Sequence, residues 1–323
     1  MISMILRRLA ILPVVLLIIY TVTFLLAWSL PGEAALNNPD GREPPQAVLD
    51  AINAQYNLDS APEFYVQYLY NASGLHWVVD RLNGGDISQT KVFDLGPSFR
   101  NADWSVNEIV ADSLPVSIVL GLSAIFMAVV IGLIAGMIGA VKPNSLADLG
   151  TLVIALVGIS LPSFVIGTVL LIAFPVWLGV GSVGKWGGIG DIFLPAFSLS
   201  LPFAAYIARL TRMGMIDVLN ADFIRTARAK GVSRRQVILK HALKNAFLPV
   251  LSYLGPATAF AMTGSFVVER VFNIPGMGQH FVDAVQAKDL FLIMGVTLVF
   301  ATILILLNLM VDVLYRWVDP RIE

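Results

Sequence analysis

Residues 113–141 read SLPVSIVLGLSAIFMAVVIGLIAGMIGAV, a stretch that contains no Asp, Glu, Lys or Arg. A helix needs about 20 consecutive, mostly apolar residues to cross the hydrocarbon core of a bilayer. This stretch is longer than that requirement, so it predicts a membrane-spanning helix.

Further runs of the chain share this lack of charge. Most of them reach spanning length outright, and the shortest, 192–208, is near the lower limit, although the aromatic and apolar stretch Phe193–Leu210 can still span. The runs are 9–32, 149–184, 192–208, 246–268 and 290–311. Together with 113–141, they predict an all-α integral membrane protein with six transmembrane helices.

The composition of the 323 residues agrees with this class. Charged residues make up 13% of the chain, about half of the usual 25% for soluble domains, and hydrophobic residues make up 57%. The net charge of −1 gives no bulk attraction to nucleic acid. The chain has no cysteine, which excludes disulfides, Cys-ligated zinc, iron–sulfur clusters and thiol catalysis. We expect no cofactor, no resident metal and no nucleic-acid partner.

The placement of basic residues predicts the orientation. Arg7 and Arg8 followed by Leu9–Leu30 resemble a signal peptide, but the apolar stretch exceeds the usual 7–15 residues, which favours an uncleaved helix. With the N-terminus in the cytoplasm, 14 of the 21 Lys and Arg residues fall on the cytoplasmic side. We therefore expect both termini to be cytoplasmic.

This topology divides the chain into residues 1–31, the first transmembrane helix, residues 32–112, an extracytoplasmic subdomain, and residues 113–323, a core of five transmembrane helices. The subdomain has 12 acidic and 4 basic residues. Ser60–Glu63 and Ser105–Glu108 fit capping boxes, and we expect Pro115 to separate or kink the helix that the second box opens. The aromatic residues of the segment favour a folded element over the alternative of a spacer.

One cytoplasmic loop, about residues 209–245, carries nine basic and two acidic residues. Its centre, residues 220–249, reads NADFIRTARAKGVSRRQVILKHALKNAFLP. The pattern predicts a short helix that stops at Gly231 and a second helix capped by Ser233.

Two interpretations of this loop remain open. It could anchor the chain to lipid headgroups, or its helix–turn–helix could fit a groove on a partner protein. Small residues, a glycine stop and a capped second helix at fixed spacing favour the partner protein. The candidate contact residues are Ala221, Asp222, Phe223, Arg225, Thr226, Ala227, Arg228, Ala229, Lys230, Gly231 and Ser233.

The loop resembles the coupling segment of membrane subunits of binding-protein-dependent ABC importers, whose pattern is Glu-Ala-Ala, three residues, then Gly. Arg225, Thr226 and Ala227 occupy the first three positions here, and Gly231 falls in register. The departures from the general pattern are typical of the peptide-importer branch, closest to the B-type subunit of oligopeptide permeases. Further segments resemble the same branch: 94–99, 114–117, 159–164, 275–278 and 311–321.

The resemblance implies a multi-pass permease subunit of a bacterial inner membrane that moves peptides, with oligopeptides favoured. The implied partners are a second homologous permease subunit, two cytoplasmic ATPase subunits and an extracytoplasmic peptide-binding protein, besides membrane lipid. In this interpretation the loop docks on an ATPase: Ala227 and Ala229 permit close approach, Gly231 makes the turn, and Arg225, Arg228 and Lys230 pair with acidic residues.

Enzymatic function is not indicated by any motif. Gly179–Lys185 fits a phosphate loop until Trp186 replaces the required Ser or Thr, and there is no His-Glu-x-x-His. We expect no catalytic residue, and any ATP hydrolysis would come from partner subunits. The alternatives are an intramembrane enzyme and half of a secondary transporter. Secondary transporters usually place ionisable groups at mid-membrane, and the apolar runs of this chain lack such groups.

A few residues inside or beside the apolar runs carry structural expectations. Glu269 and Asp312 are expected to have structural roles, with Asp312 one turn from Arg316 and able to pair with it. Pro275–Gly278 is expected to form a turn of an external hairpin. The small-residue face of Gly132, Gly136 and Gly139 suits tight helix packing.

Overall fold

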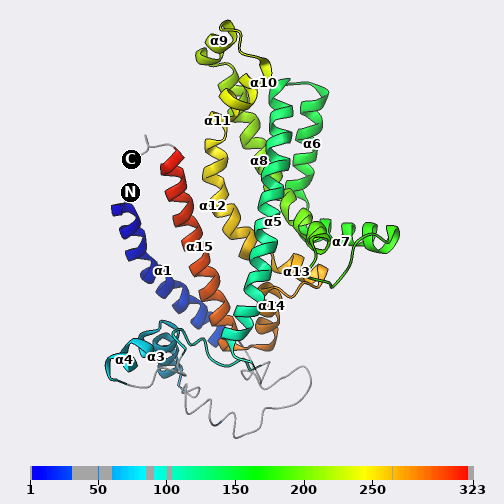
Figure 1. Cartoon of the computed structure of the whole chain (residues 1–323). Helices are drawn as coiled ribbons and strands as arrows, with labels where there is room; N and C mark the ends of the chain where they lie inside the picture. The colour runs from blue at the N-terminus through cyan, green and yellow to red at the C-terminus, as the bar shows by residue number, and fades with distance from the viewer. Residues whose placement is uncertain are drawn as a thin grey trace. The chain divides into compact units, whose positions relative to one another are not determined.

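The computed structural model describes residues 2–30, 50, 60–84, 91–99, 104–263 and 265–318 (Figure 1). Within these residues the fold is helical, and the one β-type pairing is an isolated bridge between Pro97 and Ser105. The chain divides into two compact units. Unit 1 comprises Met1–Arg8, Val116–Pro275 and Ile303–Glu323, and unit 2 comprises Leu9–Pro115 and Gly276–Thr302.

Four helices are long and apolar enough to cross a membrane by themselves. They are α1 (Ile2–Trp28), α5 (Val106–Val141), α8 (Ile189–Leu219) and α15 (Leu290–Val318). Two bent pairs pass the same test when each pair counts as one span: Leu146–Ser160 with Ser163–Leu178, bent by 100°, and Arg234–Ala246 with Leu248–Thr263, bent by 55°. The described residues therefore contain four to six candidate spans, and each lies in or over a predicted apolar run.

The other helices of unit 1 form the two bent pairs or connect the spans. They are α6 (Leu146–Ser160), α7 (Ser163–Leu171), a π-helical turn (Ile172–Leu178), α9 (Asp222–Ala229), α10 (Arg234–Gln236), a second π-helical segment (Val237–Ala242), α11 (Leu243–Ala246), α12 (Leu248–Thr263) and α13 (Phe266–Phe272). The sequence interpretation missed the break between α6 and α7 inside the apolar run 149–184. Pro162 causes it, because proline lacks the N–H that would continue the hydrogen-bond ladder of α6.

Glycines in α5 set the distance between α5 and α8. A Cβ on Gly132 would lie 2.7 Å from the carbonyl oxygen of Ala204, and a Cβ on Gly136 would lie 2.6 Å from that of Ala208. Real Cβ atoms do not approach other heavy atoms this closely, so only glycine permits the packing. The predicted small-residue face is confirmed at these two positions.

Unit 2 is organised by aromatic side chains around α3 (Ala61–Ala72), α4 (Leu75–Leu82) and α14 (Met277–Ala287). Phe64 and Tyr68 of α3 are fully buried, and both rings lie within 6 Å of the ring of Phe291, centroid to centroid. Tyr20 donates a 2.6 Å hydrogen bond to the carbonyl oxygen of Tyr65. The described part of segment 32–112 is thus a packed element, while residues 32–49, 51–59, 85–90 and 100–103 lie outside the described residues.

Two expectations about helix starts had different outcomes. At Ser105 the capping box forms: its N–H and hydroxyl each donate to a Glu108 carboxylate oxygen at 2.7 Å. At Ser60 the expectation was wrong, because its side chain makes no capping bond, and Pro62 has already removed one of the N–H groups that a cap would satisfy.

Of the two effects expected of Pro115, separation of the helix was wrong, since α5 continues through this residue as one helix. Proline in a helix interior costs about 3 kcal/mol. On its two sides Ile109 and Leu120 are fully buried, and burying each such side chain contributes about 1.5–3 kcal/mol. Packing on both sides therefore outweighs the local cost of the proline.

Candidate coupling site

The basic loop is shorter than the sequence interpretation proposed. Arg209 and Arg212, placed at the start of the loop, lie inside α8, which continues to Leu219. Gly214 also lies inside α8, and a Cβ on it would lie 3.2 Å from the Cα atom of Ala246 in α11, so the glycine permits close packing there. We use the name coupling segment for residues 220–236, which follow α8.

The turn at Gly231 has the geometry that the sequence predicted. Gly231 adopts φ +79° after the last turn of α9. Its N–H donates to the carbonyl oxygen of Arg228 at 3.0 Å, and the N–H of Val232 donates to that of Ala227 at 3.2 Å. This pair of bonds is the Schellman ending of a helix, which satisfies carbonyl groups that would otherwise lack a partner.

Ser233 begins the second helix, also as predicted. Its hydroxyl oxygen accepts a hydrogen bond from the N–H of Gln236 at 3.4 Å, and its backbone is extended, as an N-cap requires. The helix that follows is partly π-helical over Val237–Ala242. A glycine turn and a capped start thus lie within three residues of each other.

A small apolar cluster fixes α9 to the rest of unit 1. Ile224 is fully buried together with Met215 of α8 and Val237, and Ala227 and Val232 pack on the cluster. Ile224 was missed as a site residue, although its spacing of three from Ala227 could have indicated a shared buried face. Ala227, expected to permit close approach by a partner, is partly buried and packs against this cluster of its own chain.

The remaining face of α9 is exposed. Phe223 keeps 47% of its surface accessible, and Thr226, Arg228, Ala229 and Lys230 are exposed as well. Arg225 lies 3.4 Å from Asp222, but both side chains are more than three-quarters exposed, so the pair contributes little to stability. Within unit 1, α9 lies beyond the end of α8 (Figure 1). It presents an aromatic ring and several cations on a short helix.

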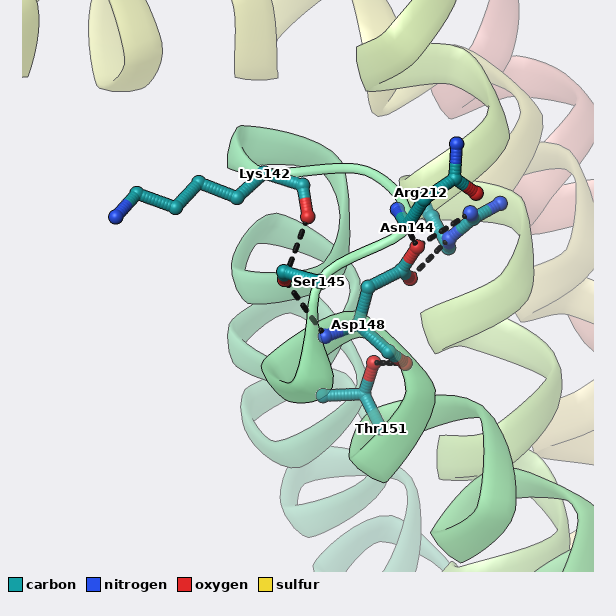
Figure 2. Close-up of polar contacts among 6 residues, drawn as sticks. All are labelled: Lys142, Asn144, Ser145, Asp148, Thr151 and Arg212. Atoms are coloured by element: carbon teal, nitrogen blue, oxygen red, sulfur yellow. Dashed lines mark hydrogen bonds and ion pairs between the residues drawn. The ribbon is translucent and has the colours of Figure 1, made fainter.

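A buried ion pair holds α8 against α6 before the coupling segment begins. Figure 2 shows Arg212 donating to both carboxylate oxygens of Asp148, from Nε at 2.6 Å and from Nη2 at 2.8 Å. The N–H of Asn144 donates to the same carboxylate at 2.8 Å, and Ser145 caps α6 through the N–H of Asp148. Asp148 is 1% exposed. This arrangement fixes the turn between α5 and α6 to the helix that leads into α9.

The sequence interpretation missed this ion pair. Asp148 stands at the edge of an apolar run and was taken only as its boundary. The available signal was Ser145 three residues before Asp148, which is the spacing of a helix-capping pair.

The two acidic residues expected to be structural have partners in the structure. Glu269 is fully buried and accepts hydrogen bonds from the hydroxyl groups of Ser117 at 2.8 Å and Ser265 at 2.5 Å. Asp312 pairs with Arg8 at 2.8 Å, and the side chain of Arg316, its expected partner, lies outside the described residues. Among the described residues, no group of three or more His, Asp or Glu side chains could hold a metal ion.

Two family profiles match the chain. Residues 113–323 match the binding-protein-dependent transport system inner membrane component, and residues 1–121 match the N-terminal membrane component of the same systems. The first match covers the candidate spans that follow α1, together with the coupling segment.

Similar proteins agree along the full length. The chain is 40% identical to the oligopeptide transport system permease protein OppB of Escherichia coli K12, with all of both chains covered. It is 38% identical to the dipeptide transport system permease protein DppB of Bacillus subtilis 168, covering 95% of this chain and 93% of the relative.

A solved structure supports the fold. The inward-facing MetNI methionine ABC transporter matches with a TM-score of 0.52 at 17% identity, over 66% of this chain and 97% of the transporter chain. The profile match over 113–323 and the full-length relatives show that the chain belongs to the family of binding-protein-dependent transport system inner membrane components.

Proposed function

We propose that this chain is the permease subunit through which an ATP-driven importer moves peptides, oligopeptides in particular, delivered by an extracytoplasmic binding protein. The observation that carries the proposal is the 40% identity to an oligopeptide permease subunit over the whole of both chains. As an inner membrane component, the chain is a transport subunit and not an enzyme, so ATP hydrolysis belongs to separate ATPase subunits.

The proposed topology has six spans with both termini in the cytoplasm. It counts each bent helix pair as one span, with residues 1–31 as the first helix, 32–112 as an extracytoplasmic subdomain and 113–323 as the five-span core. In this orientation 14 basic residues lie on the cytoplasmic side and 7 on the external side, as the positive-inside rule requires. The proposed partners are a second homologous permease subunit, two ATPase subunits and the binding protein.

The coupling segment is proposed to dock in a groove of one ATPase subunit. Its exposed face combines Phe223 with Arg228 and Lys230, which suits a groove with an apolar floor and acidic walls. The buried Ile224 cluster and the Asp148–Arg212 pair support this role, because a docked helix transmits movement only if it is fixed to its own subunit.

The function is tested with the complex reconstituted in lipid vesicles. We expect uptake of a labelled tri- to pentapeptide that requires the binding protein, ATP and both ATPase subunits. Uptake that runs on an ion gradient without ATPase subunits would support a secondary transporter instead.

The coupling role is tested against lipid anchoring by replacing the three exposed bases with Gln: Arg225, Arg228 and Lys230. Docking predicts weaker recovery of the ATPase subunits with this chain, more so at high salt, because exposed charge pairs are screened. Anchoring predicts normal ATPase recovery and disturbed insertion. Replacement of Lys240 and Lys244 by Gln is the matched control, since it changes exposed bases of the same loop that follow the coupling segment.

A further inference from the structure

A small cavity of unit 1 lies where α6 breaks from α7. Its volume is about 210 Å³, and its lining combines Ile159 and Ser163 at the break with Tyr206 of α8 and Tyr253 and Phe260 of α12. The rings of Tyr206 and Tyr253 are 4.4 Å apart, centroid to centroid. Among the described residues, no charged side chain lines this cavity.

The cavity lies at membrane depth. α6 has 15 residues, so the break is about 22 Å from its first residue, within a hydrocarbon core about 30 Å thick. Tyr206 precedes the end of α8 by a similar distance, about 20 Å. The break therefore falls inside the apolar pair Leu146–Ser160 and Ser163–Leu178, and not at its ends.

Backbone groups at the break lack partners. Pro162 has no N–H to donate to the carbonyl oxygen of Gly158, and no described residue donates to the carbonyls of Ile159, Ser160 or Leu161. An unsatisfied backbone carbonyl in hydrocarbon costs several kcal/mol. Non-helical backbone at this depth is tolerated where it is buried in protein or borders a polar cavity. This is the first indication that the cavity faces something other than lipid.

The tyrosine hydroxyls give a second, independent indication. Neither Tyr206 nor Tyr253 makes a hydrogen bond with any residue that the structure describes, and Tyr206 is 41% exposed. The hydroxyl groups of Ser200 in α8 and Ser252 in α12, by contrast, are satisfied by carbonyls of their own helix. A phenol cannot reach such a carbonyl, so its hydroxyl needs an external partner.

We propose that this cavity is part of the peptide path, where the hydroxyls of Tyr206 and Tyr253 bind the backbone amides of a passing peptide. The inference rests on the proposed function. Backbone amides are common to all peptides, and hydroxyls that both donate and accept can serve them in either orientation. The rings supply apolar surface for side chains, and the absence of charge avoids a preference for acidic or basic peptides.

Uptake by the reconstituted complex tests the hydroxyls directly. Tyr206→Phe and Tyr253→Phe each remove one hydroxyl and preserve the ring, and each is expected to lower peptide uptake about fivefold, the effect of one lost hydrogen bond. Tyr70→Phe on α3 is the matched control and should transport normally. ATPase recovery with the chain should be unchanged in all three variants. Unchanged uptake in the Tyr206→Phe, Tyr253→Phe double variant would overturn the proposal.

Thiol labelling tests the cavity without relying on the size of that effect. The chain has no cysteine, so Tyr206→Cys and Ser163→Cys provide single thiols. A small, charged thiol reagent is expected to modify both, and a saturating tripeptide should slow the modification. Phe126→Cys, on α5 and 70% exposed, is the control for a position outside the cavity.

The outcomes separate the two proposals. If wild-type complex imports peptide but Tyr206→Cys reacts no faster than Phe126→Cys, the path assignment fails and the proposed function stands. If Tyr206→Cys is modified but peptide gives no protection although uptake is intact, the cavity is water-filled and lies outside the path. If wild-type complex imports no peptide, both proposals fail.

Discussion

Gly231 offers the sharpest test of the coupling segment, because its substitution perturbs the backbone and nothing else. Its φ of +79° is a conformation that residues with a Cβ adopt at a cost of about 1–2 kcal/mol. No atom lies within 4 Å of the Cβ that a substitution would add, so there is no steric cost. Alternatively, the backbone can adopt a different turn. The hydrogen bonds donated by the N–H groups of Gly231 and Val232 are then lost, at a combined cost of about 2 kcal/mol of stability.

These two costs are comparable for alanine, so Gly231→Ala should populate both the native and the altered turn. Gly231→Val has a branched Cβ that raises the cost of the native turn further, and it should favour the altered one. Gly231→Asn tolerates the left-handed conformation and should be mildest. We expect peptide uptake and ATPase recovery to fall in the order Asn, Ala, Val.

Gly84 provides the control, since it has φ +71° and likewise nothing within 4 Å of an added Cβ, but it follows α4 in unit 2. Gly84→Val carries the same backbone strain outside the coupling segment. It should leave ATPase recovery at the wild-type level. Equal losses in Gly84→Val and Gly231→Val, or none in Gly231→Val, would refute the reasoning.

Three further substitutions test the supports of the site. Asp148→Asn removes the only carboxylate within reach of Arg212 in the described residues, and because that guanidinium is partly exposed we expect a loss of about 2 kcal/mol, measured as a lower Tm of the purified complex. Gly136→Leu should prevent close packing of α5 and reduce the amount of folded protein, whereas Gly150→Leu in α6, which has open space, should accumulate normally. Ser233→Ala removes a long capping bond worth about 0.5–1 kcal/mol and should speed trypsin cleavage within the loop of the folded complex.

The spans could be predicted from the sequence because a charged side chain in hydrocarbon is costly, so charge-free runs coincide with membrane helices. The glycine stop and the serine cap were predictable for a different reason: each is a local feature set by the backbone of a few residues. Gly231 and Ser233 need only their immediate neighbours to form a turn and a helix start.

What the sequence did not reveal depends on contacts between distant residues. Ile224 becomes an anchor only because Met215 and Val237 surround it. Arg212 was assigned to a loop because basic residues mark membrane boundaries, but its partner Asp148, 64 positions away, makes it part of a helix packing contact. Pro162 could have predicted the break between α6 and α7 from the sequence. The cavity at the break could not be predicted, because the tyrosines of α8 and α12 that line it are distant in the sequence.

The glycine contact between α5 and α8 has a mechanical consequence. Where Gly132 and Gly136 lie against the carbonyls of α8, backbone touches backbone with no side chain between them. Side chains can absorb a displacement by changing rotamer, but a backbone contact has no such freedom. A force that reaches α8 through the coupling segment would therefore move α5 and α8 together as one rigid body. The deformation would be taken up between Ser160 and Ser163, where the backbone hydrogen bonds of the helix are already interrupted.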